Sequence, residues 1–99
     1  MLESEFQAKL IKKLESIFNG CVIMKNDANY RQGFPDLLVL FNNAWAVLEV
    51  KESESAPFRP NQEWYLDKLD KMSFSACIYP ENESEVLHSL QEFFGEIRV

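Results

Sequence analysis

The chain has 99 residues and a mass of 11.6 kDa, which is the usual size of one domain. With 46% hydrophobic and 26% charged residues it has an ordinary globular composition, which excludes collagen, a linker and a disordered chain. A net charge of −6 excludes a protein that coats nucleic acid by bulk electrostatics. We therefore expect a single globular domain over residues 1–99.

The N-terminus, the apolar runs and the cysteines bear on location. Glu3 and Glu5 precede the first lysine, which is unlike a secretory signal. No uninterrupted apolar run exceeds five residues, whereas a bilayer span needs roughly 20. Cys21 and Cys77 lack metal-ligand spacing and are expected to be buried free thiols. These patterns predict a cytoplasmic protein that is neither secreted nor inserted in a membrane.

Apolar periodicity defines the elements of the first third of the chain. Residues 3–18 carry apolar side chains at helical spacing, and Asn19-Gly20 is a stop signal for that helix. Residues 21–25 have the pattern of a short strand. Residues 26–35 contain Asn, Asp, Gly and Pro, which predicts a loop.

A hairpin follows this loop. The apolar runs 36–41 and 44–50 are separated by Asn42-Asn43, and asparagine tolerates the positive φ angles of a two-residue turn. In that register Asp36 lies opposite Glu49 on one face of the sheet, with Cβ atoms about 4.5–5.5 Å apart. Lys51 shares this face because side chains alternate along a strand. Both faces are otherwise apolar, so we expect helices on both sides of the sheet.

The second half of the chain alternates helix and strand. Asn82 and Glu85 have the spacing of a capping box at the start of the last helix. The predicted elements are a loop over 51–59, a helix from Pro60 to about Met72, a strand over 74–79 and a helix ending near Gly95. The order αβββαβα predicts an α/β fold with a mixed central sheet flanked by helices.

Two opposed carboxylates at the end of a buried sheet need compensation. Like charges directly opposite one another are destabilising, and burial increases the penalty. Lys51 balances one charge, whereas a hard divalent cation balances both Asp36 and Glu49 and accepts oxygen ligands from each. In the alternative interpretation, Asp36 caps the preceding loop while Glu49 and Lys51 fan into solvent.

Three motifs in order resemble the PD-(D/E)XK nuclease superfamily, and most closely its small stand-alone VRR-NUC branch. They are Gly33-Phe34-Pro35-Asp36 with the strand that follows it, Leu48-Glu49-Val50-Lys51, and Pro60-Asn61-Gln62-Glu63-Trp64. The resemblance covers roughly residues 3–79 and implies a restriction-endonuclease-like core. It also implies a bacterial or phage-infected cell as the setting.

The resemblance implies roles for the residues of these motifs. Asp36 and Glu49 correspond to ligands of Mg²⁺, for which Mn²⁺ substitutes, and the Val50 carbonyl to a third oxygen ligand. Lys51 corresponds to the group that orients or deprotonates the attacking water and helps to neutralise the phosphate in the transition state. No nucleotide cofactor is implied.

An acidic residue on the first helix usually completes such a site. The apolar stripe of that helix centres close to Glu3, whereas Glu5 lies nearly opposite, so we choose Glu3 as catalytic residue and metal ligand. A favourable contact with the helix dipole is the alternative role for Glu3. Gln62 matches the family glutamine near the site. The tyrosine that some branches carry four residues later is replaced by Leu66, which leaves an exposed first-turn glutamine as the alternative.

Polar and cationic residues flank the predicted site. Arg and Lys side chains there are suited to phosphates, and Tyr30 to stacking on a base or sugar, although an ordinary solvated loop has the same composition. The residues that we assign to DNA binding are Lys25, Asn26, Tyr30, Arg31, Gln32 and Arg59. Gly33 is expected to permit a close approach that a side chain would block.

Four further side chains receive structural rather than catalytic interpretations. Trp45, Phe58 and Trp64 are expected in the core or at a dimer contact. His88 has no nearby Cys or second His, so we expect it on the surface.

The sequence therefore predicts a Mg²⁺-dependent endonuclease that cleaves branched or duplex DNA, with a four-way (Holliday) junction as the expected substrate by resemblance. Such a small chain offers little surface for reading sequence, so recognition of DNA shape by a symmetric homodimer suits it. The alternatives are a nickase or flap nuclease, a nuclease subunit of a repair or restriction assembly, and a non-catalytic DNA-binding module of the same fold.

Overall fold

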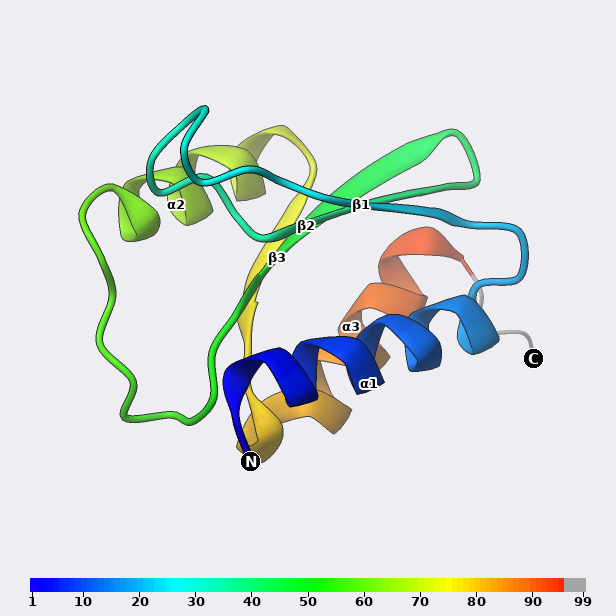
Figure 1. Cartoon of the computed structure of the whole chain (residues 1–99). Coiled ribbons are helices and arrows are strands. Elements are labelled where there is room, and N and C mark those ends of the chain that lie inside the picture. The colour runs from blue at the N-terminus through cyan, green and yellow to red at the C-terminus, as the bar shows by residue number, and fades with distance from the viewer. Residues whose placement is uncertain (96–99) are drawn as a thin grey trace.

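The computed structural model describes residues 1–95 as a mixed four-stranded sheet with three helices (Figure 1). The order of the elements is α1 (Glu3–Ile17), β1 (Val22–Lys25), β2 (Leu37–Phe41), β3 (Ala44–Val50), α2 (Gln62–Met72), β4 (Phe74–Ile78), a short 3₁₀ turn η1 (Pro80–Asn82) and α3 (Glu83–Phe94). This confirms the predicted α/β class and the order of helices and strands. The residues after Gly95 lie outside the described range.

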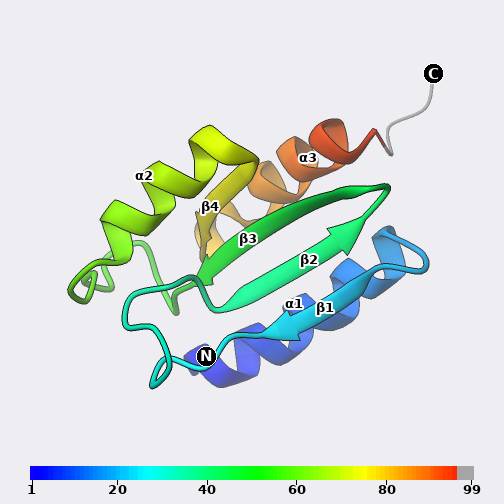
Figure 2. The ribbon, with the colours of Figure 1, turned by 90° about the horizontal axis from the view of Figure 1, so that it is seen from above.

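The strands lie side by side in the order β1-β2-β3-β4 (Figure 2). β1, β2 and β3 are antiparallel, and β4 pairs parallel with β3. The parallel pair requires a crossover, and α2 supplies it between β3 and β4. The sheet is therefore mixed, as predicted.

The hairpin between β2 and β3 has the predicted turn and register. Asn42 and Asn43 have φ angles of 51° and 61°, the left-handed values that a two-residue turn of this type demands. The ladder runs from Leu37 opposite Leu48 to Phe41 opposite Ala44 without a bulge. Asp36, predicted as the first residue of the strand, instead precedes β2.

The core lies between the sheet and the helices α1 and α3, which share one side of it (Figure 1). Leu10 and Leu14 of α1 and Leu90 of α3 are fully buried there. They pack with alternate strand residues such as Val39 and Leu48, as period-2 alternation requires. The apolar stripes of the two helices thus explain why this face of the sheet is closed.

The opposite face is partly open, which corrects the expectation that helices cover both sides. There α2 packs against β4 and β3. Toward the β1 edge, Val22 is 53% exposed, Met24 52% and Leu40 39%. One short helix does not span a four-stranded sheet, and that is the physical reason for the difference.

Two predicted helix starts are corrected. Pro60 lies in a turn before α2, and Asn61, with a φ of 72°, precedes the first helical residue. The capping box of Asn82 and Glu85 does not form. Asn82 instead accepts a hydrogen bond from the Tyr79 amide (2.8 Å) and donates one to the Cys77 carbonyl (3.0 Å).

These contacts of Asn82 close part of the outer edge of β4. Farther along the same edge, the Ser75 amide donates to Asp70 Oδ1 over 3.0 Å. Side chains that satisfy edge groups in this way block the addition of another strand. This edge of the sheet is thus protected by residues of the chain itself.

Some expectations about single side chains also change. Cys21 and Cys77 are free, as predicted, but half-buried rather than buried. Trp64 is 59% and Phe58 42% exposed, so neither belongs to the core. His88 is on the surface, as predicted, 3.7 Å from Glu92 Oε1. No helix within residues 1–95 combines the length and the hydropathy needed to cross a bilayer.

Candidate active site

A cavity of about 400 Å³ opens where β2 begins and β3 ends. All five residues predicted to be catalytic line it, namely Glu3, Asp36, Glu49, Lys51 and Gln62, together with the predicted DNA-binding residues Gln32 and Arg59. These residues come from α1, two loops, β3 and the first turn of α2. The fold thus gathers in one place the residues that are dispersed over the sequence.

Glu49 is the most buried acid of this cavity, at 2% exposure. Its Oε2 accepts a hydrogen bond of 2.8 Å from Gln62 Nε2. The other oxygen, Oε1, is buried and accepts no hydrogen bond from a donor group among the described residues. Desolvation, the negative charge of Asp36 and a hydrogen bond between the two carboxyl groups raise the pKa of Glu49 to about 8, although Lys51 acts in the opposite direction. Glu49 therefore does not fan into solvent, and that alternative is wrong.

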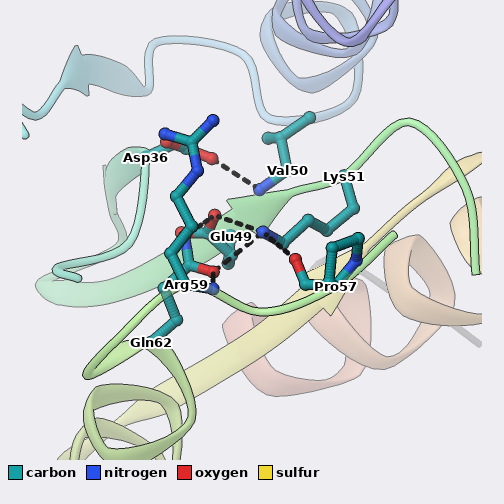
Figure 3. A network of polar contacts seen from close by, with 7 residues as sticks. All are labelled: Asp36, Glu49, Val50, Lys51, Pro57, Arg59 and Gln62. Carbon is teal, nitrogen blue, oxygen red and sulfur yellow. Dashed lines mark hydrogen bonds and ion pairs between the residues drawn. The ribbon is translucent and has the colours of Figure 1, made fainter. Parts of the chain in front are cut away.

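The Asp36 side chain is hydrogen-bonded to the backbone of β3. Its Oδ2 accepts a hydrogen bond of 2.8 Å from the amide of Val50, the last residue of β3 (Figure 3). The loop preceding β2 is fixed at the same point, because the main-chain amide of Asn26 donates to the main-chain carbonyl of Asp36 over 2.8 Å. Asp36 is thus held at the sheet end by both its main chain and its side chain.

Lys51 is buried as well, at 5% exposure. Its Nζ donates to Gln62 Oε1 (2.8 Å) and to the Pro57 carbonyl (3.1 Å), and lies 3.8 Å from Glu49 Oε2 (Figure 3). The loop between β3 and α2 encloses the ammonium group, and the ring of Phe58 lies 5.4 Å from it. Two neutral acceptors and one carboxylate thus hold Lys51 in the cavity wall.

Gln62 joins Lys51 and Glu49. Its Oε1 accepts from Lys51 and also from the Arg59 amide (2.7 Å), while its Nε2 donates to Glu49. At 8% exposure it is buried, so the interpretation as an exposed first-turn glutamine is wrong. An amide suits this position because it donates and accepts at the same time.

The two acids of the first helical turn are placed differently. Glu3 lines the cavity, and its pKa is raised by partial burial and by the charge of Asp36, against Lys51 and Arg59. Both side chains are exposed, but Glu5 is not part of the cavity wall. The structure thus separates these acids in the way that the apolar stripe of the helix predicts.

The remaining predicted DNA-binding residues line a neighbouring cavity. Lys25, Asn26, Tyr30 and Arg31 contribute to its walls, and Phe34 lies between this cavity and the first. Phe34 has no role predicted from the sequence, although it lies within the Gly-Phe-Pro-Asp motif. The structure therefore divides the predicted DNA-binding residues between two adjoining cavities.

Tyr65, for which the sequence predicts no role, anchors the loop of residues 26–35. The Arg31 guanidinium donates to its hydroxyl over 3.1 Å, and the Phe34 ring packs edge-on against it at 5.3 Å. Tyr65 lies three residues after Gln62, on the same side of α2, and this spacing is the signal that would have found it.

The carboxyl oxygens of Glu49 and Asp36 are the type of ligand that a hard divalent cation prefers. Glu49 Oε1 is a buried carboxyl oxygen that accepts no hydrogen bond from a donor group, and the hydrogen bond from Val50 to Asp36 Oδ2 leaves lone pairs on Oδ1. Within residues 1–95, no three His, Cys, Asp or Glu side chains form a ready-made metal cluster. Mg²⁺ characteristically binds one or two carboxylates and completes its shell with water and substrate phosphate.

No family model, curated protein or solved structure matches the chain.

Proposed function

We propose that this protein is a metal-dependent DNA endonuclease with a PD-(D/E)XK site on a restriction-endonuclease-like core. One observation carries the proposal. Glu49 is buried, with one oxygen that accepts no hydrogen bond from a donor group, beside Asp36 and Lys51 in the wall of an open cavity. Buried, unpaired carboxylate oxygens are costly, so they mark a functional site better than a structural one.

The candidate metal ligands are Asp36 and Glu49, with the Val50 carbonyl as a third oxygen donor. Bound Mg²⁺ would supply Lewis-acid polarisation of the phosphate and lower the pKa of a water ligand. Glu3, on the wall of the same cavity, is the proposed third acid of the site. The small number of carboxylates suits a site that is completed by the phosphate of its substrate.

Lys51 is the proposed catalytic cation. Its ammonium group is held by Gln62 and by the Pro57 carbonyl, so little reorganisation is needed when negative charge develops on the phosphate. Gln62 is the proposed positioning residue, since it fixes Lys51 and Glu49 relative to one another. Arg59 and Gln32, on the same cavity wall, are proposed to contact the DNA backbone.

The distribution of charge accommodates DNA on an acidic protein. Lys51, Arg59, Arg31 and Lys25 line the two adjoining cavities at one end of the sheet. Helix α3, with acidic residues in its first turn, lies on the same side of the sheet as α1 (Figure 1). Local cationic contacts therefore remain available despite the net charge of −6.

The proposed substrate is branched DNA, a four-way junction above all, and the proposed active form is a homodimer. Two sites related by twofold symmetry would place paired cuts on a symmetric junction. Light scattering at micromolar concentration, with and without junction DNA, tests the dimer. A monomer under both conditions would remove the paired-cut part of the proposal.

A gel cleavage assay tests the activity. Matched four-way junction, nicked, flap and linear duplex DNA would be incubated with Mg²⁺ or Mn²⁺, and Glu49→Ala protein purified in parallel would control for contaminating nucleases. Metal-dependent symmetric cuts in the junction are expected. Equal cutting of every substrate would refute selectivity for branched DNA, and no cutting above the Glu49→Ala background would refute the proposed activity.

A further inference from the structure

A second cavity, of about 300 Å³, adjoins the proposed active site. Lys25, Asn26, Asp27, Tyr30, Arg31 and Phe34 line it. Phe34 also lines the first cavity, so the two share a wall. This volume is at the lower end of the range for sites that take small organic groups.

The loop that forms this cavity is held in place by its own hydrogen bonds. Asn26 Nδ2 donates to the Pro35 carbonyl (2.7 Å) and closes the base of the loop. Within the loop, the Tyr30 amide donates to the Asp27 carbonyl (3.1 Å) and the Phe34 amide to the Arg31 carbonyl (3.3 Å). Binding to a wall ordered in advance costs less conformational entropy.

Two aromatic side chains of the cavity differ in their surroundings. Phe34 is packed against Tyr65, so its position is fixed. Tyr30 is 87% exposed, and its ring packs on no other ring within residues 1–95. A tyrosine ring in water, at the rim of a cavity, offers a free stacking surface.

Cationic groups flank these rings. Arg31 is tethered by its hydrogen bond to Tyr65, and Lys25 ends strand β1 on the cavity wall. Aromatic rings between basic side chains characterise sites that hold single-stranded nucleic acid, where the rings stack on bases and the cations contact phosphates. Because Phe34 lines both cavities, the rings and basic side chains of the second cavity adjoin the proposed catalytic residues.

We propose that the second cavity receives an unpaired nucleobase from the DNA strand whose phosphate lies in the first cavity. This inference rests on the proposed endonuclease function and narrows its substrate class. A base inside a duplex is stacked on both sides and does not reach Tyr30 without being extruded. The enzyme therefore selects substrates with an unpaired nucleotide beside the scissile phosphate, such as the centre of a junction or the base of a fork.

The test uses a base that reports its own stacking. 2-Aminopurine would be placed at the unpaired position of a forked oligonucleotide and, in a second probe, inside a continuous duplex. Fluorescence would be recorded with the full chain in EDTA, where metal-dependent cleavage does not proceed. Quenching of the forked probe and no change in the duplex probe are expected, because an aromatic contact quenches an unstacked base.

Variants assign the quenching to the cavity. Tyr30→Ala should abolish it and weaken binding of the forked probe roughly 5- to 150-fold, the range for loss of one stacked base. Tyr30→Phe, which keeps the ring, should retain it. Phe93→Ala removes another exposed aromatic side chain, which lines neither cavity and packs on Phe74 and Phe94 instead, and should also retain it. Circular dichroism checks that each variant is folded.

The outcomes separate this inference from the proposed activity. Quenching that Tyr30→Ala abolishes, by a protein that cleaves no substrate, would support the base site and refute the endonuclease. Metal-dependent cleavage by a protein that leaves the forked probe unquenched would support the endonuclease and overturn the base site. Equal quenching by wild type and Tyr30→Ala would also overturn it.

Discussion

The Asp36 carboxylate accepts a hydrogen bond of 2.8 Å from the backbone amide of Val50 and so ties the start of β2 to the end of β3. The predicted partner of Asp36 across the hairpin is Glu49, whose backbone lies one residue earlier. Asp36 therefore has a structural role, through Val50, and an electrostatic one, because its charge raises the pKa of Glu49. Different substitutions separate the two roles.

We predict that Asp36→Ala and Asp36→Asn change stability in opposite directions in the absence of metal. Alanine removes the acceptor of the Val50 amide and should lower the free energy of unfolding by about 1–3 kcal/mol. Asparagine keeps an acceptor and removes a negative charge beside Glu49, so it should stabilise the protein at pH 9, where Glu49 is ionised. Thermal melting in EDTA measures both, and a clear drop for Asp36→Asn would contradict the role given to charge repulsion.

Stability should fall as pH rises, because of Glu49. Its pKa is about 8 in the folded protein against an ordinary value of 4.5, so between these values the folded chain holds a proton that the unfolded chain has lost. The free energy of unfolding should then decrease by about 1.4 kcal/mol per pH unit between pH 4.5 and 8. Outside this window Glu49 should add little to the pH dependence. Glu49→Gln should remove this slope. Urea denaturation of both proteins at pH 5.5 and 8.5 in EDTA measures this difference. Equal changes in the free energy of unfolding for wild type and Glu49→Gln would show that the pKa of Glu49 is not raised.

Replacing Gln62 should affect stability and catalysis together. Gln62→Leu removes one buried hydrogen bond from each of Lys51, Glu49 and the Arg59 amide, which should cost about 1–3 kcal/mol or more of unfolding free energy. The rate of cleavage should fall while DNA affinity changes little, since Gln62 is 8% exposed. Glu63→Leu, at the exposed neighbouring position, serves as the control and should stay within about 0.5 kcal/mol of wild type. An unchanged cleavage rate in Gln62→Leu would exclude the positioning role.

Gly33→Ala should destabilise the protein more than Gly20→Ala. Both glycines have positive φ angles, 87° and 90°, which cost an L-residue about 1–2 kcal/mol. A Cβ at Gly33 would lie 2.6 Å from Asn61 Cβ and 2.7 Å from the Pro60 carbonyl oxygen, whereas one at Gly20 meets nothing within 4 Å. The difference between the two variants in urea denaturation isolates the contact of the loop with the start of α2. Equal losses would mean that this contact contributes nothing.

The features that the sequence predicted well depend on local chemistry. Asn42-Asn43 determines the turn and thereby the register of every pair in the hairpin, because side chains alternate with a period of two. The close approach at Gly33 was predicted from residue type, and Asn61 and Pro60 prove to be the neighbours that require it. The site residues come together largely because the turn and the alternation are correct.

The features that it did not predict depend on contacts distant in the sequence. Asn82 has the spacing of a helix cap, yet its side chain bonds Tyr79 and Cys77, since the adjacent edge of β4 offers unpaired groups. The burial of Gln62 follows from Glu49 and Lys51, which a helix-start pattern does not contain. Likewise, the partial opening of one sheet face reflects the length of α2 relative to the width of the sheet.

The closed outer edge of β4 has a consequence for growth of the sheet. A strand from another chain would have to displace Asn82 from Tyr79 and Cys77, and Asp70 from Ser75, before it could form a ladder there. The edge at β1 carries four residues, too few for a long ladder. Fibril-like stacking of copies edge to edge is thus opposed at one end by side-chain hydrogen bonds and at the other by the brevity of the strand.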